Sequence, residues 1–190
     1  MSEINLSITH LSSYTTLKEL FLKKGKRVEY TKKAYFLQQK CPSLTVGWIE
    51  SGSFRYICTN EAGNERIVCF SFEGELVCDY ASFIHQEPAL ISIQAITDCA
   101  VYQLSYKELM DFVEKNSDTQ RVGRNIAESM FKMAYQRMLQ AYCDSPEQRY
   151  LNLMQRCPNL KEKVPLKEIA SFLGVTPETI SHIRKKLLYK

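Results

Sequence analysis

The chain has 190 residues, 45% of them apolar and 24% charged, which suits one or two folded domains and argues against wholesale disorder. No apolar run approaches the ~20 residues that a membrane helix needs, and the N-terminus lacks a signal-peptide pattern, so we expect a cytoplasmic protein without membrane contact. The net charge of +4 combines −3 over residues 1–120 with +7 over residues 121–190, which favours a polyanionic partner for the C-terminal part alone.

The first 105 residues change from a helical to a strand pattern. Residues 5–25 carry a rough helical stripe that ends near Gly25, with apolar positions at Leu11, Leu17, Leu20, Phe21 and Leu22. Short runs of β-forming residues then alternate with turn signals, and they lie at 44–49, 53–58, 66–72, 90–96 and 99–104. Gly63 marks a polar turn between two of these runs. Several short strands at near-regular spacing predict an antiparallel sandwich or barrel.

Helical periodicity returns at Ser105, which is placed to cap a short helix. A longer helix is predicted over residues 119–142, because apolar residues recur every three or four positions at Val122, Ile126, Met130, Met133, Ala134, Met138 and Ala141. This helix can pack on its own domain or pair with a second copy of itself. A candidate domain boundary follows at 143–145, where Ser145 and Pro146 predict the start of the next helix, which ends before Pro158.

The strongest signal is a pair of helices joined by a tight turn within residues 166–185. Ala170 is small enough for a second helix to cross there, and Gly174 tolerates a positive φ in the turn. Thr176 and Pro177 then cap and begin the second helix. Apolar residues at the spacings needed to lock the two helices together are Ile169, Phe172, Leu173, Val175, Ile180 and Ile183. This arrangement predicts a helix-turn-helix.

The outer face of the second helix is polar and basic. Its side chains can hydrogen-bond to base edges or phosphates, and the predicted DNA contacts are Thr176, Glu178, Thr179, Ser181, His182, Arg184, Lys185 and Lys186. A two-helix corner with a basic tail would share some of these features. The full spacing, the cap and the basic surplus together favour DNA binding. Glu178 also suits the first turn of a helix, and both roles can hold at once.

The seven cysteines are odd in number and include no Cys-x-x-Cys pair, so a disulfide framework is not expected. We expect buried thiols in a reducing cytoplasm. The sequence has no evident Ser-His-Asp order, metal cluster or phosphate loop, so we do not expect an enzyme.

At these residues the chain resembles the Crp/Fnr family of bacterial regulators, named after the cAMP receptor protein. Phe72-Glu-Gly-Glu-Leu76 is similar to the Gly-Glu-Leu turn of the family's β-roll, and residues 95–105 are similar to its last two strands. The resemblance implies an α+β fold with an antiparallel, cyclic-nucleotide-binding-like β-roll at 1–115, a dimerisation helix at 116–143 and a helix-turn-helix at 144–190. It also implies a homodimer that binds double-stranded DNA and recruits or hinders RNA polymerase.

The resemblance places an effector pocket at Gly74, Glu75, Leu76, Ala89 and Leu90. In family members that bind cyclic nucleotides, an arginine pairs with the phosphate and a polar residue follows it. Ala89 and Leu90 occupy those places here, and His85 and Gln86 nearby supply no dependable positive charge. Burying a phosphate without a cation is costly, so we expect an unknown small-molecule effector other than cAMP. Ala89 and Leu90 either line an apolar pocket or fill it.

No cofactor is expected. The family's iron–sulfur branch needs clustered N-terminal cysteines, whereas the first cysteine here is Cys41. The haem branch needs an axial ligand, for which His10, His85 and the cysteines are the weak candidates.

Two departures from the family bear on DNA recognition. His182 stands where an arginine is common, so the preferred half-site does not follow from the sequence. The sequence ends at Lys190, where many relatives continue into a hairpin wing, so we expect fewer backbone contacts. An alternative function is a small-molecule sensor whose output is a protein contact.

Overall fold

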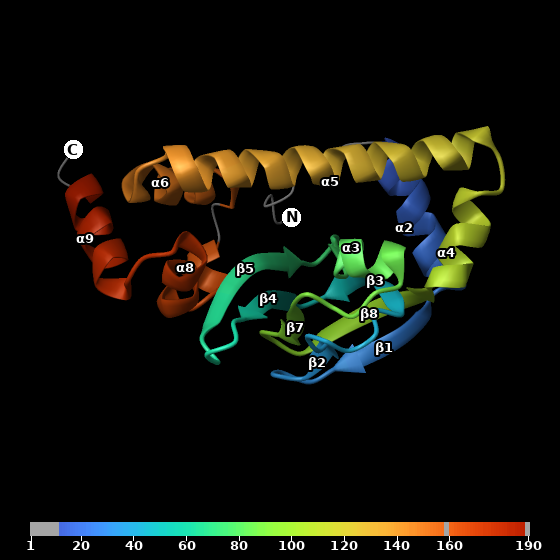
Figure 1. The fold of residues 1–190 in the computed structure, drawn as a ribbon, viewed down its shortest axis with the longest axis horizontal. Coiled ribbons are helices and arrows are strands. Elements are labelled where there is room, and N and C mark those ends of the chain that lie inside the picture. The colour runs from blue at the N-terminus through green and yellow to red at the C-terminus, as the bar shows by residue number, and fades with distance from the viewer. Residues whose placement is uncertain (1–11, 158–159, 189–190) are drawn as a thin grey trace.

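The computed structural model describes residues 12–157 and 160–188. Its N-terminal part is a β-roll of two four-stranded antiparallel sheets (Figure 1). One sheet has the order β1 (Lys26–Tyr30), β8 (Cys99–Ser105), β3 (Thr45–Ser51), β6 (Leu76–Val77). The other has the order β2 (Tyr35–Leu37), β7 (Ser92–Ala95), β4 (Ser53–Thr59), β5 (Glu65–Phe72). The predicted antiparallel architecture is confirmed, and β1, β2 and β6 are additions to the predicted strands.

The interior of the roll is made by side chains that alternate inward along these strands. Ile49, Phe54, Ile93 and Val101 are among its fully buried members. The polar turn predicted between β4 and β5 is present, where the Asn64 N–H donates to the Asn60 side chain at 2.9 Å and Gly63 has a φ of +80°.

Four helices cover one side of the roll: α2 (Ser12–Lys24), α3 (Tyr80–His85), α4 (Tyr106–Val113) and α5 (Ser117–Cys143). Ser105 caps α4 as predicted, in a reciprocal pair of hydrogen bonds with Glu108. The part of the predicted N-terminal helix before Ser12, with Leu11, lies outside the described residues. Within α2, Leu17, Leu20 and Phe21 are buried, but Leu22 is 48% exposed, so its place in the apolar stripe was predicted wrongly. Tyr14 takes the buried position instead, against Trp48.

The long helix α5 divides into two halves with different surroundings. In its first half, Val122, Ile126 and Met130 pack against α2, α4 and the roll. In its second half the predicted apolar residues Ala134, Met138 and Ala141 are exposed. Packing on the chain's own domain therefore accounts for the first half, and the second half keeps an exposed apolar surface. Pairing with a second copy stays a prediction.

The C-terminal part contains α6 (Pro146–Arg156), α7 (Leu160–Lys163), α8 (Leu166–Leu173) and α9 (Pro177–Leu188). Ser145 caps α6 as predicted, since its hydroxyl accepts from the Gln148 N–H at 3.2 Å. These helices share one hydrophobic cluster with β5, in which Phe70 and Phe72 of the roll lie with Leu153, Ile169 and Ile180. The C-terminal helices thus dock directly on the β-roll.

Candidate nucleic-acid interface and effector pocket

The turn between α8 and α9 has the geometry that its sequence predicts. Gly174 ends α8 with a φ of +68°, and a Cβ there would meet no further atom within 4 Å. The backbone conformation, and not crowding, therefore requires glycine at this position. The Val175 N–H donates to the Ala170 carbonyl at 3.0 Å, and the Thr176 hydroxyl accepts from the Thr179 N–H at 3.3 Å. These hydrogen bonds cap the end of α8 and the start of α9.

The inner face of the helix pair is closed by the predicted apolar residues. Ile180 has no exposed surface, and Ile169, Ala170, Leu173 and Ile183 are also buried. Phe172 and Val175 are half-buried at the edge of the same cluster, where the Phe172 ring lies 5.5 Å from that of Phe70. The second helix is therefore fixed against the first, and its other face is left to solvent.

The outward face of α9 carries the predicted DNA contacts. All are exposed except Thr179, which is half-buried. Hydrogen bonds from its own backbone N–H and from Thr176 lower the pKa of Glu178, so its carboxylate is a charged acceptor at neutral pH. Ser181 donates to the Pro177 carbonyl at 3.0 Å, and Lys186 pairs with Glu147 of α6 at 2.6 Å. Lys186 is thus engaged within the chain, unlike Arg184 and Lys185, for which the described structure contains no ion pair.

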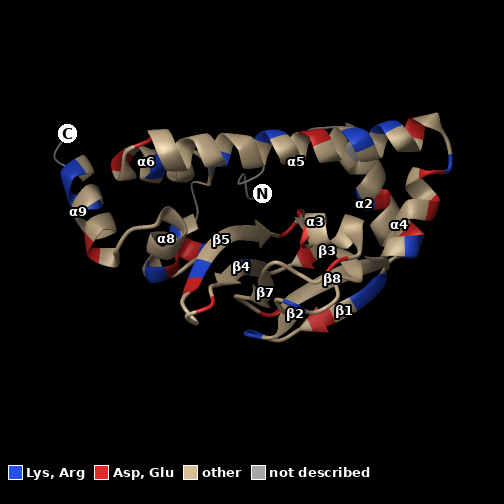
Figure 2. Cartoon of the chain, in the orientation of Figure 1, with Lys and Arg blue, Asp and Glu red and all other residues tan. Residues whose placement is uncertain are grey.

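Basic residues also gather beside the helix-turn-helix (Figure 2). A cleft of about 500 Å³ lies between the roll and the segment from α7 to the start of α8, and its lysines are Lys32, Lys33, Lys161, Lys163 and Lys167. Sequence reasoning named none of these lysines, because they come together from segments more than a hundred residues apart.

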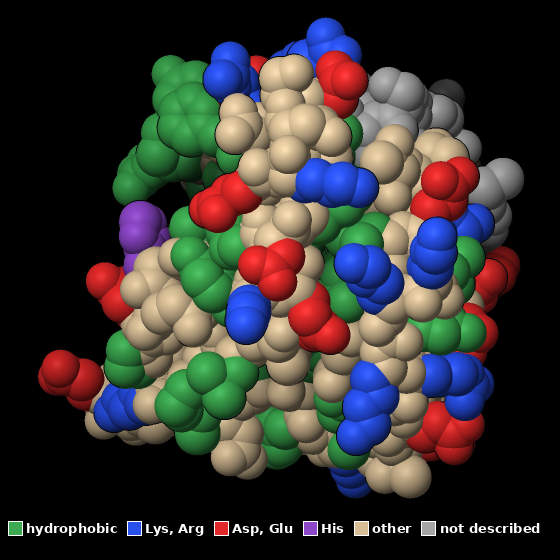
Figure 3. All heavy atoms as spheres, turned by 90° about the vertical axis from the view of Figure 1, so that its right-hand side faces the viewer, with side chains coloured by type: hydrophobic (Ala, Val, Ile, Leu, Met, Phe, Trp, Pro, Cys, Tyr) green, Lys and Arg blue, Asp and Glu red, His purple; other side chains and the backbone are tan. Residues whose placement is uncertain are grey.

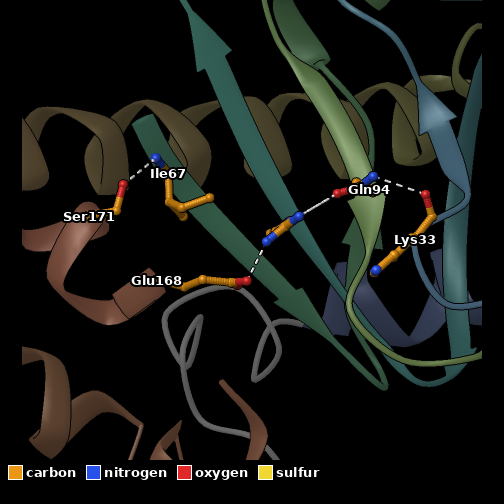
Figure 4. Close-up of polar contacts among 6 residues, drawn as sticks. Lys33, Ile67, Gln94, Glu168 and Ser171 are labelled. Atoms are coloured by element: carbon orange, nitrogen blue, oxygen red, sulfur yellow. Dashed lines mark hydrogen bonds and ion pairs between the residues drawn. The ribbon is translucent and has the colours of Figure 1, made fainter. Parts of the chain in front are cut away.

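Polar contacts join the roll to α8 (Figure 4), and two of the residues that make them, Arg55 and Glu168, line this cleft. Arg55 of β4 forms an ion pair with Glu168 of α8 and donates to the Gln94 side-chain oxygen at 2.6 Å. Ser171 of α8 accepts from the Ile67 N–H at 3.0 Å. The Glu168 side chain is only 9% exposed, against 25% for Arg55. This pairing ties the orientation of the helix-turn-helix to the roll.

The predicted effector-pocket residues do not come together around one cavity. Gly74 forms the turn with a φ of +81°, and Glu75 is buried, with its carboxylate accepting from the Phe72 N–H at 3.0 Å. Ala89 is buried inside the roll. Leu90 departs from the prediction: it is 64% exposed, because its backbone N–H is held by Asp79 at 2.8 Å while its side chain faces outward.

A cavity of only about 90 Å³ lies between the roll and α5, next to the turn at Gly74. Leu76 lines it, together with Tyr14, Tyr56, Met130 and Met133. Burial, with the nearby Glu75 carboxylate, raises the pKa of Tyr14, whose hydroxyl accepts from the Leu76 N–H at 3.1 Å.

A cation that the sequence analysis missed enters this region from α5. Arg137 donates to the Cys69 sulfur at 3.2 Å, and Cys69 and Glu75 raise the pKa of the Arg137 guanidinium. Arg137 follows Met130 and Met133 at helical spacing, which is the signal that could have placed it on the side of α5 that faces the roll.

The candidate metal and haem ligands are dispersed. Within residues 12–157 and 160–188, no three His, Cys, Asp or Glu side chains are grouped to hold a metal ion. His10 lies outside these ranges, and His85 is exposed. The expected burial of the thiols holds for Cys78, Cys99 and Cys157, whereas Cys41 and Cys143 are exposed; all seven are free.

Comparison with known proteins supports the predicted resemblance. Residues 27–116 match the family model of the cyclic nucleotide-binding domain. The cAMP-activated global transcriptional regulator CRP of Salmonella typhimurium is 24% identical over 169 residues, which cover 84% of this chain and 80% of that protein.

Two solved structures share the fold over most of the chain. FixK2 from Bradyrhizobium japonicum superposes with a TM-score of 0.73 at 16% identity, covering 87% of this chain and 85% of that one. The c-di-GMP responsive global regulator CLP of Xanthomonas campestris superposes with a TM-score of 0.67 at 19% identity, covering 92% of each chain.

Among the helices of residues 12–157 and 160–188, none combines the length and the apolar composition that a membrane span requires.

Proposed function

Because this chain resembles Crp/Fnr-type regulators in sequence and in fold, we propose that it is a homodimeric, sequence-specific DNA-binding transcription regulator of the cytoplasm. The observation that carries the proposal is the outward face of α9, which presents exposed hydrogen-bonding and basic side chains on a rigid helix-turn-helix. A helix of this kind fits the major groove of B-DNA. The non-enzymatic character and a contact with RNA polymerase belong to the same proposal.

Base reading is assigned to the first turns of α9 and phosphate contact to its end. Glu178 is an ionised acceptor suited to the amino group of cytosine. Ser181 and His182 follow on the exposed face, and Thr176 and Thr179 lie at the helix start. Arg184 and Lys185 supply phosphate contacts, and Lys186 adds one when its pairing with Glu147 opens.

Dimerisation is assigned to the second half of α5. Its exposed apolar residues are Phe131 (71%), Tyr135 (50%), Met138 (46%), Leu139 (41%) and Tyr142 (85%). Positions 131, 135, 138 and 142 follow the alternating four- and three-residue spacing of a coiled-coil seam. A continuous apolar stripe of this kind on one helix favours pairing with the same stripe of a second copy.

We propose an effector other than cAMP. The cavity beside the Gly74–Leu76 turn is about 90 Å³, whereas sites for drug-sized ligands measure about 300–1,000 Å³. No basic residue stands at positions 89 and 90, and Arg137 already contacts Cys69.

Selection of binding sites from a random DNA library by the purified protein, at fixed near-physiological salt, tests the proposal. We expect a palindrome whose half-sites lie about one or two helical turns apart. Binding without sequence preference and without a steep dependence on salt would reject it and favour a sensor that acts through a protein contact.

A further inference from the structure

A second, larger cavity lies at the end of the molecule where α2, α4 and the start of α5 meet. Its volume is about 270 Å³. Its walls come from the roll, with Val46 and Leu76, and from α3 as well as from α2, α4 and α5. The residues that it shares with the 90 Å³ cavity are Leu76, Cys78, Ile126 and Met130. Figure 3 views the molecule from this end, where hydrophobic side chains show between Lys and Arg side chains.

Small residues of α5 form part of the wall of this cavity. Gly123 and Ala127, one turn apart, both line the cavity. A Cβ at Gly123 would already lie 3.0 Å from a Val113 methyl group, so a larger residue there would intrude on α4. Met110 and Met130 also line the cavity, and methionine side chains adapt readily to a ligand's shape. The walls are therefore apolar and adjustable.

Arg124 supplies the charge. It is the one charged residue among those that line the cavity within the described chain, and it is exposed. The ion pairs of the described residues do not include it. A guanidinium beside an apolar space is suited to a carboxylate that carries a hydrocarbon body.

The volume of the cavity limits the size of the hydrocarbon part of such a ligand. A water-sized group takes about 30 Å³ in a liquid, so the cavity holds roughly nine such groups.

We propose that this cavity binds a small amphipathic carboxylate, with a hydrocarbon chain of about seven or eight carbons inside the cavity and its carboxylate against Arg124. The ligand would touch α5, the helix that carries the proposed dimer stripe and leads to the helix-turn-helix. We identify this ligand as the effector of the regulator, and only that identification rests on the proposed function.

Titration of the full chain with octanoate, followed by tryptophan fluorescence, tests the proposal. The sequence has one tryptophan, Trp48, and its ring lies 6.4 Å from the ring of Phe21, which lines the cavity. Octanol, which has the same chain and no charge, is the comparison ligand. We expect saturable binding of both, with octanoate the tighter.

Three variants make the test specific. Arg124→Gln should weaken octanoate binding by about threefold or more and leave octanol binding unchanged. Arg121→Gln, one turn earlier on α5 in an exposed pair with Asp118, should change neither. Ala127→Leu should weaken both ligands by filling the cavity. Absence of saturable binding, or equal affinities for octanoate in the wild type and in Arg124→Gln, would overturn the proposal. Because fluorescence is read without DNA, a protein that binds octanoate but selects no DNA site would reject the proposed function alone.

Discussion

Replacing Arg55 with methionine should destabilise the protein by about 3 kcal/mol, because it leaves a buried carboxylate without its cation. The Glu168 side chain is 9% exposed, and its second oxygen has no hydrogen-bond partner in the described chain. Glu168→Gln should cost only about 1 kcal/mol, since the amide oxygen still accepts from an arginine that is 25% exposed. The two partners therefore differ in the cost of their removal.

Urea unfolding of the two single variants and of the double variant measures both effects. The double variant should be more stable than the summed single costs imply, with a coupling of about 1–2 kcal/mol. Arg27→Met is the matched control, because its partners Glu29 and Glu50 are exposed, and it should cost at most about 1 kcal/mol. Additive costs, or an Arg55→Met cost no larger than that of Arg27→Met, would refute the reasoning that the pairing joins the roll to α8.

Three further changes have defined outcomes. Gly174→Ala should cost about 1–2 kcal/mol in urea unfolding because its φ is +68°, and Gly174→Asn should cost less; equal costs would mean that crowding matters there. Tyr135→Glu should shift the protein from dimer to monomer in sedimentation velocity, whereas the exposed Gln136→Glu outside the stripe should not; a dimer in both would place the interface elsewhere. Burial raises the pKa of Cys78 to about 12, so its thiolate is scarce, and iodoacetamide at about pH 8 should label the exposed Cys41 and Cys143 first by mass spectrometry; early labelling of Cys78 would show that its site opens.

The features that sequence reasoning located are those set by local chemistry. Gly174, Thr176 and Pro177 fix the turn and the start of α9 within a few residues, so the helix-turn-helix could be predicted. Capping by Ser105 and Ser145 fixed two helix starts in the same way. The β-roll was predictable as a series of short strands, although the brief strands β1, β2 and β6 left no alternation long enough to detect.

The features that the sequence analysis missed depend on contacts distant in the chain. Arg55 and Glu168 are 113 positions apart, and neither has a local signal of the pairing. Leu22 fits a helical stripe by hydrophobicity, but the direction in which α2 packs turns it outward. The cavity under α2 and α4 is lined by four helices, α2, α3, α4 and α5, together with the roll, and no single segment reveals such a meeting of elements.

The most direct test of the central claim is the base preference of Glu178→Ala on the selected palindrome, measured by fluorescence anisotropy against duplexes changed at single base pairs. The account predicts that discrimination at one base pair falls by about 1–3 kcal/mol while the salt dependence of binding is unchanged. Glu162→Ala, which changes an acidic residue of α7 at the cleft beside the roll, should retain the full discrimination. A Glu178→Ala protein that distinguishes every base pair as the wild type does would contradict the assignment of α9 as the DNA-reading helix.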